Sequence, residues 1–221
     1  MELWELLGVR PGITALAGGG GKTTAMYTLA RELARRGTVI CTTTTHIFPP
    51  AHMPVLTGGR EELARAVRRW GCICAGAPAA EGKLTMLLPP EQLMEWADYV
   101  LVEADGSRHL PVKAHLPHEP EIPPAAGLTA VLAGASAFGR PVREAVHRWE
   151  RFCALTGASP EDLVTAENCA RLFEAEGIGD KIFLNQAETP EAMEQAERLA
   201  RQSSRPVYAG SLRGGTWKCL L

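Results

Sequence analysis

The sequence lacks a long apolar run, an excess of charge of either sign and the cysteine spacing of a disulfide-bonded domain. Its 221 residues carry a formal net charge of -2, which disfavours nucleic acid or an acidic membrane surface as partner. No apolar stretch approaches the roughly 20 residues that cross a bilayer. With two glutamates and no long apolar region, the opening MELWELLGVR is not expected to be a secretory signal, and the six cysteines are scattered. A reduced, cytoplasmic protein is therefore predicted.

Short apolar runs alternate with amphipathic stretches, and 46% of the residues are hydrophobic. Strands are expected at residues 13–18, 38–45, 72–77, 82–88, 99–106, 128–135, 181–188 and 206–211. Helices are expected at residues 24–37, 60–70, 90–96, about 160–176 and 189–202. This alternation predicts an α/β three-layer fold, a mostly parallel sheet with helices on both faces. We expect one P-loop NTPase domain over residues 1–221, with an irregular site loop at about 104–124.

The segment ITALAGGGGKTT, residues 13–24, places four glycines between an apolar run and a helix. In a P-loop, such glycines let backbone N–H groups converge on phosphates, while the lysine neutralises charge and the next hydroxyl reaches Mg²⁺. The predicted phosphate-binding residues are Gly18, Gly19, Gly20, Gly21, Lys22, Thr23 and Thr24, with Thr23 also a metal ligand. Leu16 stands where the usual pattern has glycine, so the loop is shorter. The alternative is a glycine-rich turn with a solvated lysine.

The run ADYVLVEADGSR predicts a buried strand that ends in acidic residues. Glu103 at such a strand end can hold Mg²⁺ through an oxygen or a water, and Asp105 can orient the nucleophile. The alternative is an ordinary turn at residues 105–107 with a solvated Glu103. Thr44, in the run of four threonines after another strand, is a further candidate for contact with Mg²⁺ or the γ-phosphate. Strand propensity alone explains that run equally well.

The segment FLNQAE ends a late strand and partly matches the guanine-reading Asn-Lys-x-Asp motif of GTPases. Asn185 would brace the loop, and Glu188 would supply the carboxylate for the base. A turn that caps the next helix at residues 189–190 is an equal alternative, so GTP and ATP both remain candidate nucleotides.

Two groups of residues could bind a transition metal, but neither has convincing spacing. His109, His115, His118 and Glu119 lie irregularly in the proline-rich loop. Cys72 and Cys74 alternate in an apolar run, where both side chains can simply belong to the core. Lys113, in the proline-rich loop, is a candidate contact for an anionic ligand, or else a solvated lysine.

The segments GGGGKTT, TTTTHI, VEADGSRHLPVKA with the following HEP, and LNQAE together resemble the YqeC family. The resemblance extends along nearly the whole chain and is most specific in EADGS with its PVKA continuation. It implies a P-loop NTPase that helps to mature a selenium-dependent molybdenum hydroxylase, with that enzyme or its molybdopterin cofactor as partner. By this resemblance, the nucleotide and metal site would comprise Lys22, Thr23, Glu103 and Asp105, lined by Arg108 and Lys113.

The expected activity is Mg²⁺-dependent hydrolysis of GTP or ATP. The amides of residues 19–22 and the Lys22 ammonium would stabilise phosphate charge, and Asp105 would orient the attacking water. Two other functions remain open: a small-molecule kinase or ATP-dependent ligase, and a nucleotide-gated chaperone with little hydrolysis. A homodimer is expected, because dimers are common among such NTPases.

Overall fold

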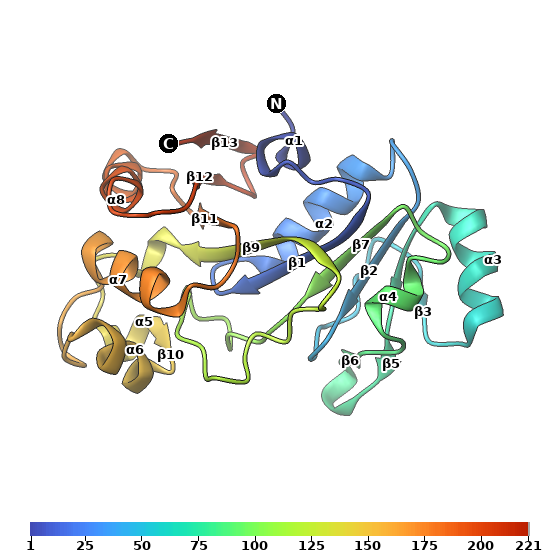
Figure 1. Ribbon diagram of the computed structural model, residues 1–221, viewed down its shortest axis with the longest axis horizontal. Helices are drawn as coiled ribbons and strands as arrows, with labels where there is room; N and C mark the ends of the chain where they lie inside the picture. Colours follow the sequence, from blue (N-terminus) through green and yellow to red (C-terminus); the bar gives the residue numbers. More distant parts are fainter. Residues whose placement is uncertain (221) are drawn as a thin grey trace. The chain divides into compact units, whose positions relative to one another are not determined.

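The computed structural model describes residues 1–220 and shows a mixed α/β protein (Figure 1). Contacts divide the chain into two compact units. Unit 1 comprises Met1–Leu16, Thr23–Gly106 and Glu121–Thr129, and unit 2 comprises Ala17–Lys22, Ser107–Pro120 and the chain from Ala130 onward. The expectation of a single domain over residues 1–221 stays a prediction.

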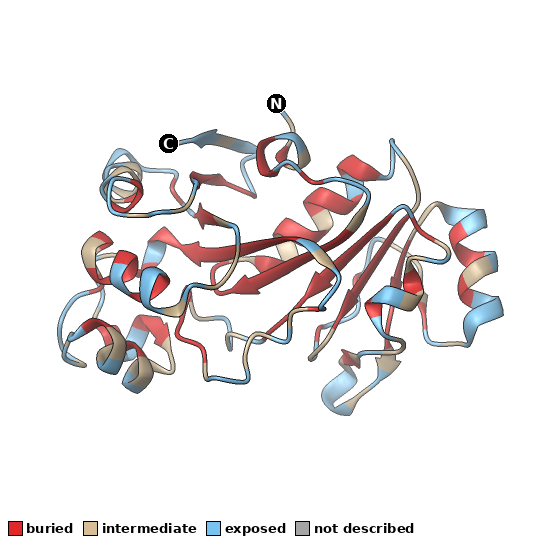
Figure 2. Ribbon diagram, viewed as in Figure 1, coloured by how far each residue is buried: buried red, intermediate tan, exposed pale blue. Residues whose placement is uncertain are grey.

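Unit 1 is built on parallel strands in the order β1-β7-β2-β4-β3. Their bounds are β1 (Gly12–Gly18, whose last two residues belong to unit 2), β2 (Val39–Thr43), β3 (Val55–Leu56), β4 (Cys72–Ala75) and β7 (Tyr99–Glu103). Every residue of β7 is buried, as expected for a strand that lies inside a parallel sheet and is covered on both faces. Figure 2 shows these strands as buried.

The remaining elements of unit 1 are short, and most of them are helices. They are α1 (Leu3–Leu7), α2 (Lys22–Leu33, whose first residue belongs to unit 2), α3 (Arg60–Trp70), α4 (Pro90–Leu93), a 3-10 turn at Ala80–Gly82 and the antiparallel pair β5 (Ala77–Pro78) with β6 (Leu84–Thr85). Helix α3 is amphipathic: it buries Leu63 and Val67 against Ile40, Ile73 and Val100 of the sheet. Its outer face is exposed in Figure 2.

Unit 2 contains a second run of strands in the order β9-β11-β12-β13, of which only β13 is antiparallel. The strands are β9 (Ala126–Gly134, whose first four residues belong to unit 1), β11 (Lys181–Asn185), β12 (Val207–Ser211) and β13 (Thr216–Cys219). The helices are α5 (Val142–Ala145), α6 (Trp149–Thr156), α7 (Ala166–Glu176) and α8 (Pro190–Ala200), with a 3-10 turn at Ala135–Ala137. A separate parallel pair joins β8 (Val112–Lys113) to β10 (Val146–His147).

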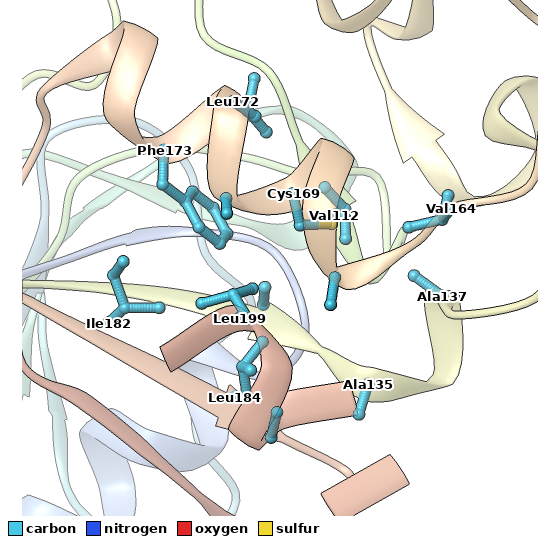
Figure 3. Close-up of a cluster of buried hydrophobic side chains, with 14 of the residues drawn as sticks. Val112, Ala135, Ala137, Val164, Cys169, Leu172, Phe173, Ile182, Leu184 and Leu199 are labelled. Carbon is cyan, nitrogen blue, oxygen red and sulfur yellow. The ribbon is translucent and has the colours of Figure 1, made fainter. Parts of the chain in front are cut away.

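The core of unit 2 is formed by α7, α8 and the strands (Figure 3). Phe173 and Leu172 of α7, Leu199 of α8, and Ile182 and Leu184 of β11 are all at most 3% exposed. Burying a side chain of this size contributes about 1.5–3 kcal/mol relative to leaving it in water. These contacts hold β11, and with it the loop that follows the strand, in a fixed position.

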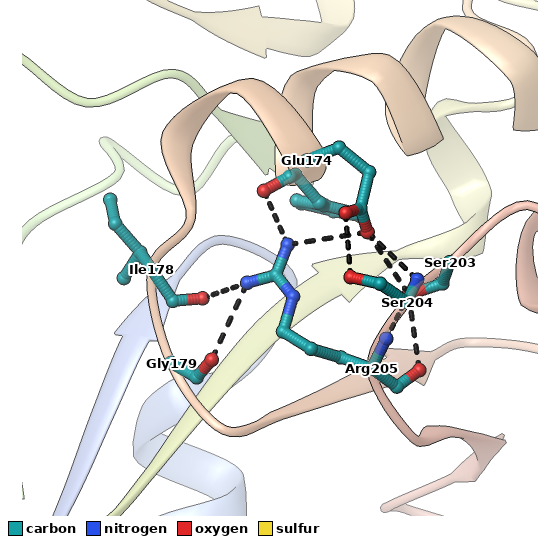
Figure 4. Close-up of polar contacts among 7 residues, drawn as sticks. Glu174, Ile178, Gly179, Ser203, Ser204 and Arg205 are labelled. Carbon is teal, nitrogen blue, oxygen red and sulfur yellow. Dashed lines mark hydrogen bonds and ion pairs between the residues drawn. The ribbon is translucent and has the colours of Figure 1, made fainter.

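The carboxyl end of α7 is closed by Arg205 (Figure 4). Its guanidinium donates to the carbonyl oxygens of Phe173 and Ile178 and forms an ion pair with Glu174 at 3.7 Å. The Ser204 hydroxyl also donates to Glu174, at 2.6 Å. The Phe173 carbonyl also accepts from the Gly177 amide at 3.0 Å, so the Arg205 guanidinium adds a second donor at this helix end, where carbonyl groups lack partners within the helix.

The predicted fold class, α/β with a mostly parallel sheet and helices, is confirmed. The helix expected at about 160–176 begins only at Ala166, because Thr165 caps it: the Asn168 amide donates to the Thr165 hydroxyl at 3.2 Å. The strand expected at residues 82–88 is reduced to the two residues of β6. Among residues 1–220, no helix is long and apolar enough to cross a membrane.

Candidate functional site

The glycines of the loop between β1 and α2 are required by backbone packing inside unit 2. A Cβ atom on Gly20 would lie 2.1 Å from the Gly134 nitrogen, and Gly20 also has a φ of +65°. A Cβ atom on Gly19 would lie 2.6 Å from the Pro111 carbonyl oxygen. Because these neighbours are backbone atoms, they cannot move aside as a side chain can. The run of glycine residues therefore shapes a close-packed turn.

Lys22 begins α2 and folds back over this turn. Its ammonium donates to the Gly18 carbonyl oxygen at 2.5 Å, and the residue is 4% exposed. The alternative of a solvated lysine therefore does not describe this side chain. The Lys22 ammonium is therefore held against the backbone of the glycine turn.

Two of the amides predicted to bind phosphate have partners within the protein. The Gly19 N–H donates to the Leu132 carbonyl at 2.9 Å, and the Gly20 N–H donates to the Leu110 carbonyl at 3.4 Å. The second distance exceeds the usual 2.7–3.2 Å of such bonds, so the hydrogen bond of the Gly20 amide is weak. The other predicted donors are the amides at residues 21–24, at the start of α2, where the first N–H groups are not bonded within the helix.

Thr23 and Glu103 come together in unit 1, as the P-loop interpretation requires. The Thr23 hydroxyl donates to Glu103 Oε2 at 2.7 Å, although 80 residues separate them in the chain. Glu103 is 6% exposed and pairs in register with Leu16 of β1 and Thr43 of β2. Both oxygens are hard donors of the kind that Mg²⁺ prefers, and a Mg²⁺ ion bound with a nucleotide needs only one or two protein ligands. The pair therefore fits a magnesium site.

Asp105 and Thr44 lie near the carboxyl end of β7, where backbone hydrogen bonds fix the chain. The Ala104 amide donates to Leu16 O at 2.9 Å, and the Ala104 carbonyl accepts from the Glu121 amide at 2.9 Å. Asp105 is fully buried. The Thr44 hydroxyl donates to the Glu121 carbonyl at 2.8 Å. Thr44 therefore ties two segments together, and its contact with a ligand stays a prediction, as do those of Asp105 and the half-buried Thr24.

Asn185 braces the glycine loop from β11, within unit 2. Its Nδ2 donates to the Gly20 carbonyl at 2.7 Å, and its Oδ1 accepts from the Leu212 amide at 2.9 Å. Glu188 is exposed, and the hydroxyl that caps α8 belongs to Thr189, which accepts from the Ala192 amide at 3.2 Å. Glu188 is therefore not the capping residue, and its contact with a base stays a prediction.

The loop at residues 107–120 holds a cluster of charges that the sequence indicated only in part. Lys113 is buried, with its ammonium 3.2 Å from Glu119 Oε2. Arg148 donates to both oxygens of the same carboxylate. Burial raises the pKa of Glu119, but the Arg148 hydrogen bonds and the Lys113 charge outweigh burial, so that the pKa is lowered overall. Arg108 lies exposed in the same loop.

Sequence reasoning missed Arg148 and its neighbour His147. The register of β10 against β8 places His147 opposite Lys113, but a pair of two-residue strands leaves no periodic signal in the sequence. A basic dipeptide between two short helices was the only local indication.

The residues that the sequence left open as transition-metal ligands do not form a metal-binding group among the described residues. Within residues 1–220, no three His, Cys, Asp or Glu side chains are grouped so that they could hold a metal ion. His115 instead pairs with Glu176, whose Oε2 lies 2.8 Å from its Nδ1. Burial, followed by the charge of Cys72, raises the pKa of Cys74 to about 12. That thiol therefore stays protonated at neutral pH, as expected for a core residue.

A strand, a glycine loop closed by Lys22 and a helix whose Thr23 contacts a strand-end acid define a P-loop protein of mixed α/β fold. The chain belongs to the YqeC family, whose model, described as "YqeC protein", matches residues 14–150.

A protein of Escherichia coli (strain K12) described as "Uncharacterized protein YqeC" is 33% identical over 169 residues, which cover 69% of this chain and 63% of that protein. The chain thus matches less than two thirds of this relative's length. The crystal structure of the signal recognition particle 54 kDa protein from Aeropyrum pernix K1 in complex with GDP matches with a TM-score of 0.39 and 14% identity. That match covers 96% of this chain and 44% of that one.

Proposed function

We propose that this chain is a Mg²⁺-dependent P-loop NTPase that binds a nucleoside triphosphate at residues 18–24. The observation that carries the proposal is the 2.7 Å hydrogen bond from the Thr23 hydroxyl to Glu103. It joins the helix that follows the glycine loop to the acidic end of a buried strand. A glycine-rich turn without a ligand does not need such an acid, whose burial costs free energy.

Each residue of the site has a distinct role in this proposal. Lys22 neutralises the outer phosphates, and the amides of residues 21–24 bind their oxygens. Thr23 and Glu103 would hold Mg²⁺, which supplies charge neutralisation and alignment of the phosphates. A hydroxyl has one proton and two acceptor positions, so Thr23 can keep its bond to Glu103 while its oxygen is a ligand. Asp105 would orient the attacking water.

The base preference depends on the segment that follows β11. Asn185 braces the loop at Gly20, and the exposed Glu188 would accept hydrogen bonds from a guanine. GTP is then bound more tightly than ATP, and Glu188→Ala removes that preference. Equal binding of both nucleotides in wild type and variant would leave Glu188 without this role.

For the biological role, we propose an accessory factor that matures a selenium-dependent molybdenum hydroxylase, in the cytoplasm and as a homodimer. The motivation for this role is the resemblance of the EADGS and PVKA segments to that family. Hydrolysis would switch the loop that carries Arg108 and Lys113, and so gate the hydroxylase or its molybdopterin cofactor. The alternative functions are a small-molecule kinase or ligase, which would consume triphosphate only with an added acid or alcohol, and a chaperone with little turnover.

The test of nucleotide binding is calorimetry on Lys22→Ala with GTP and ATP, with and without Mg²⁺. Loss of a charge-assisted contact to phosphate should weaken binding about 10- to 100-fold. Lys218→Ala is the matched control, since that side chain is 51% exposed and forms an ion pair with Glu197 at 3.0 Å. Undiminished binding by Lys22→Ala would remove the proposal.

A further inference from the structure

A basic cluster in unit 2 is separate in sequence from the glycine loop. It consists of Arg108, Lys113, His147 and Arg148, and we call it the Arg148 cluster. The parallel pair of β8 with β10 sets Lys113 opposite His147, and the Ala114 amide donates to the His147 carbonyl at 3.0 Å. Short-strand pairing therefore brings together two segments more than thirty residues apart.

The carboxylate of Glu119 occupies the position in the Arg148 cluster that an anionic ligand would take. Arg148 Nε lies 3.1 Å from Oε2, its Nη2 lies 2.8 Å from Oε1, and the Lys113 ammonium adds a third contact at 3.2 Å. A planar guanidinium fork with an ammonium beside it is how proteins recognise carboxylate and phosphate groups. The Arg148 side chain is 30% exposed and that of Glu119 19%, so a ligand in solution can reach the carboxylate position.

The surroundings of His147 show that the basic groups dominate locally. Burial lowers the pKa of His147, and the charges of Lys113, Arg148 and Arg108 lower it further, while only Glu119 acts to raise it. The half-buried ring is thus a neutral donor and acceptor beside three cations, and it can hydrogen-bond an anion without adding charge.

The backbone holds the basic residues in uncommon conformations. Arg108, His109 and Arg148 have φ values of 50°, 62° and 63°, in the left-handed region that costs a non-glycine residue about 1–3 kcal/mol. Such strain often occurs at ligand sites, and here it falls on two of the cluster's arginines.

The same loop contacts the glycine turn. Leu110, between Arg108 and Lys113, accepts the weak hydrogen bond from the Gly20 amide at 3.4 Å, and the Pro111 carbonyl accepts from the Gly134 amide at 2.7 Å. A ligand that shifts this loop can therefore alter the turn proposed to bind phosphate.

We propose that the Arg148 cluster binds the carboxylate or phosphate group of a second small-molecule ligand, which takes the place of Glu119 on Arg148. Glu119 then acts as an internal substitute for the ligand: it satisfies the fork in the free protein and moves away when the ligand arrives. This site does not require nucleotide at the glycine loop.

The test uses inorganic phosphate and succinate as probes, added separately to the full chain, with the His147 ring followed by NMR. Because the probe replaces one anion, Glu119, by another beside the ring, the expected response is a saturable change in the chemical shifts of the His147 ring with probe concentration at constant pH. The probe that binds more tightly identifies the chemistry of the natural group. No response of His147 to either probe would overturn the proposal.

Variants separate this site from the glycine loop and from a purely structural ion pair. Arg148→Gln should weaken probe binding about tenfold or more, Lys22→Ala should leave the His147 response intact, and Arg143→Gln, a 52% exposed arginine of α5, is the matched control. A response lost in Lys22→Ala but kept in Arg148→Gln would overturn the proposal, because the probe would then be bound at the glycine loop.

Glu119→Gln gives the sharpest distinction and does not depend on Arg148→Gln folding. Removing the internal competitor should tighten probe binding several-fold. A structural ion pair predicts the opposite, because the loop would lose its anchor. Weaker binding by Glu119→Gln, in protein whose circular dichroism spectrum is unchanged, would refute the receptor role.

Discussion

The bond between Thr23 and Glu103 gives a prediction that needs no ligand. Thr23→Val keeps the shape of the side chain but removes the hydroxyl that donates to Glu103 Oε2 at 2.7 Å. Glu103 is 6% exposed, so water replaces the lost donor only poorly. Thr23→Ser keeps the hydroxyl and is the matched control.

The expected cost follows from the charge and the partial exposure of the pair. A hydrogen bond to a charged group contributes about 1.5–3 kcal/mol, and the half-buried Thr23 places this bond near the lower end, about 1.5–2 kcal/mol. For a chain of this size, each kcal/mol shifts the melting temperature by about 2–4 °C. Thr23→Val should therefore melt about 3–8 °C below wild type, and Thr23→Ser within about 2 °C of it.

The assay is thermal and urea unfolding of Thr23→Val, Glu103→Gln and the double variant, without nucleotide or Mg²⁺. If the two side chains interact directly, the two losses should not add, and the double-mutant cycle should give a coupling of at least about 0.5 kcal/mol. Additive losses, or a Thr23→Val variant as stable as Thr23→Ser, would refute the reasoning. They would also remove the observation on which the proposed magnesium site depends.

Two further predictions concern unit 2. Asn185→Asp replaces the donor that reaches the Gly20 carbonyl at 2.7 Å with an acceptor, so unfolding at neutral pH should become easier by about 1–3 kcal/mol; an unchanged urea midpoint would contradict the bracing role. Folding lowers the pKa of Glu119 below its ordinary 4.5, so the stability that Glu119 contributes is present above that value and is lost as the pH falls through the folded-state pKa. The difference in unfolding free energy between wild type and Glu119→Gln should thus be constant near neutral pH and shrink as the pH falls below 4.5, and a difference that does not shrink with falling pH would show that the charge of Glu119 is not its source.

The sequence predicted the parts of the fold that have a strong local signal. Buried parallel strands are nearly continuous apolar runs, and β7, with five buried residues before its acidic end, is clear from composition alone. The P-loop was also evident, because its glycines, lysine and threonine are contiguous. Glu103 was predicted correctly to lie at a strand end, and its hydrogen bond to Thr23 is consistent with the role expected for both.

The parts that were missed depend on contacts distant in the chain. The acceptors for the Gly19 and Gly20 amides, Leu132 and Leu110, are carbonyl groups, which every residue has and no sequence pattern marks. Arg148 acquires its role because β10 pairs with β8 through two residues each, too few to show alternation. Pairing of this kind is set by tertiary packing and overrides local propensity.

Three of the four glycines of the turn are anchored by hydrogen bonds. The Lys22 ammonium holds the carbonyl of Gly18, Leu132 holds the amide of Gly19, and Asn185 holds the carbonyl of Gly20. Glycine loses more conformational entropy on ordering than any other residue, and here that loss occurs when the protein folds. A ligand that binds this turn therefore meets a preorganised backbone, and its affinity is not reduced by the entropic cost of ordering a flexible loop.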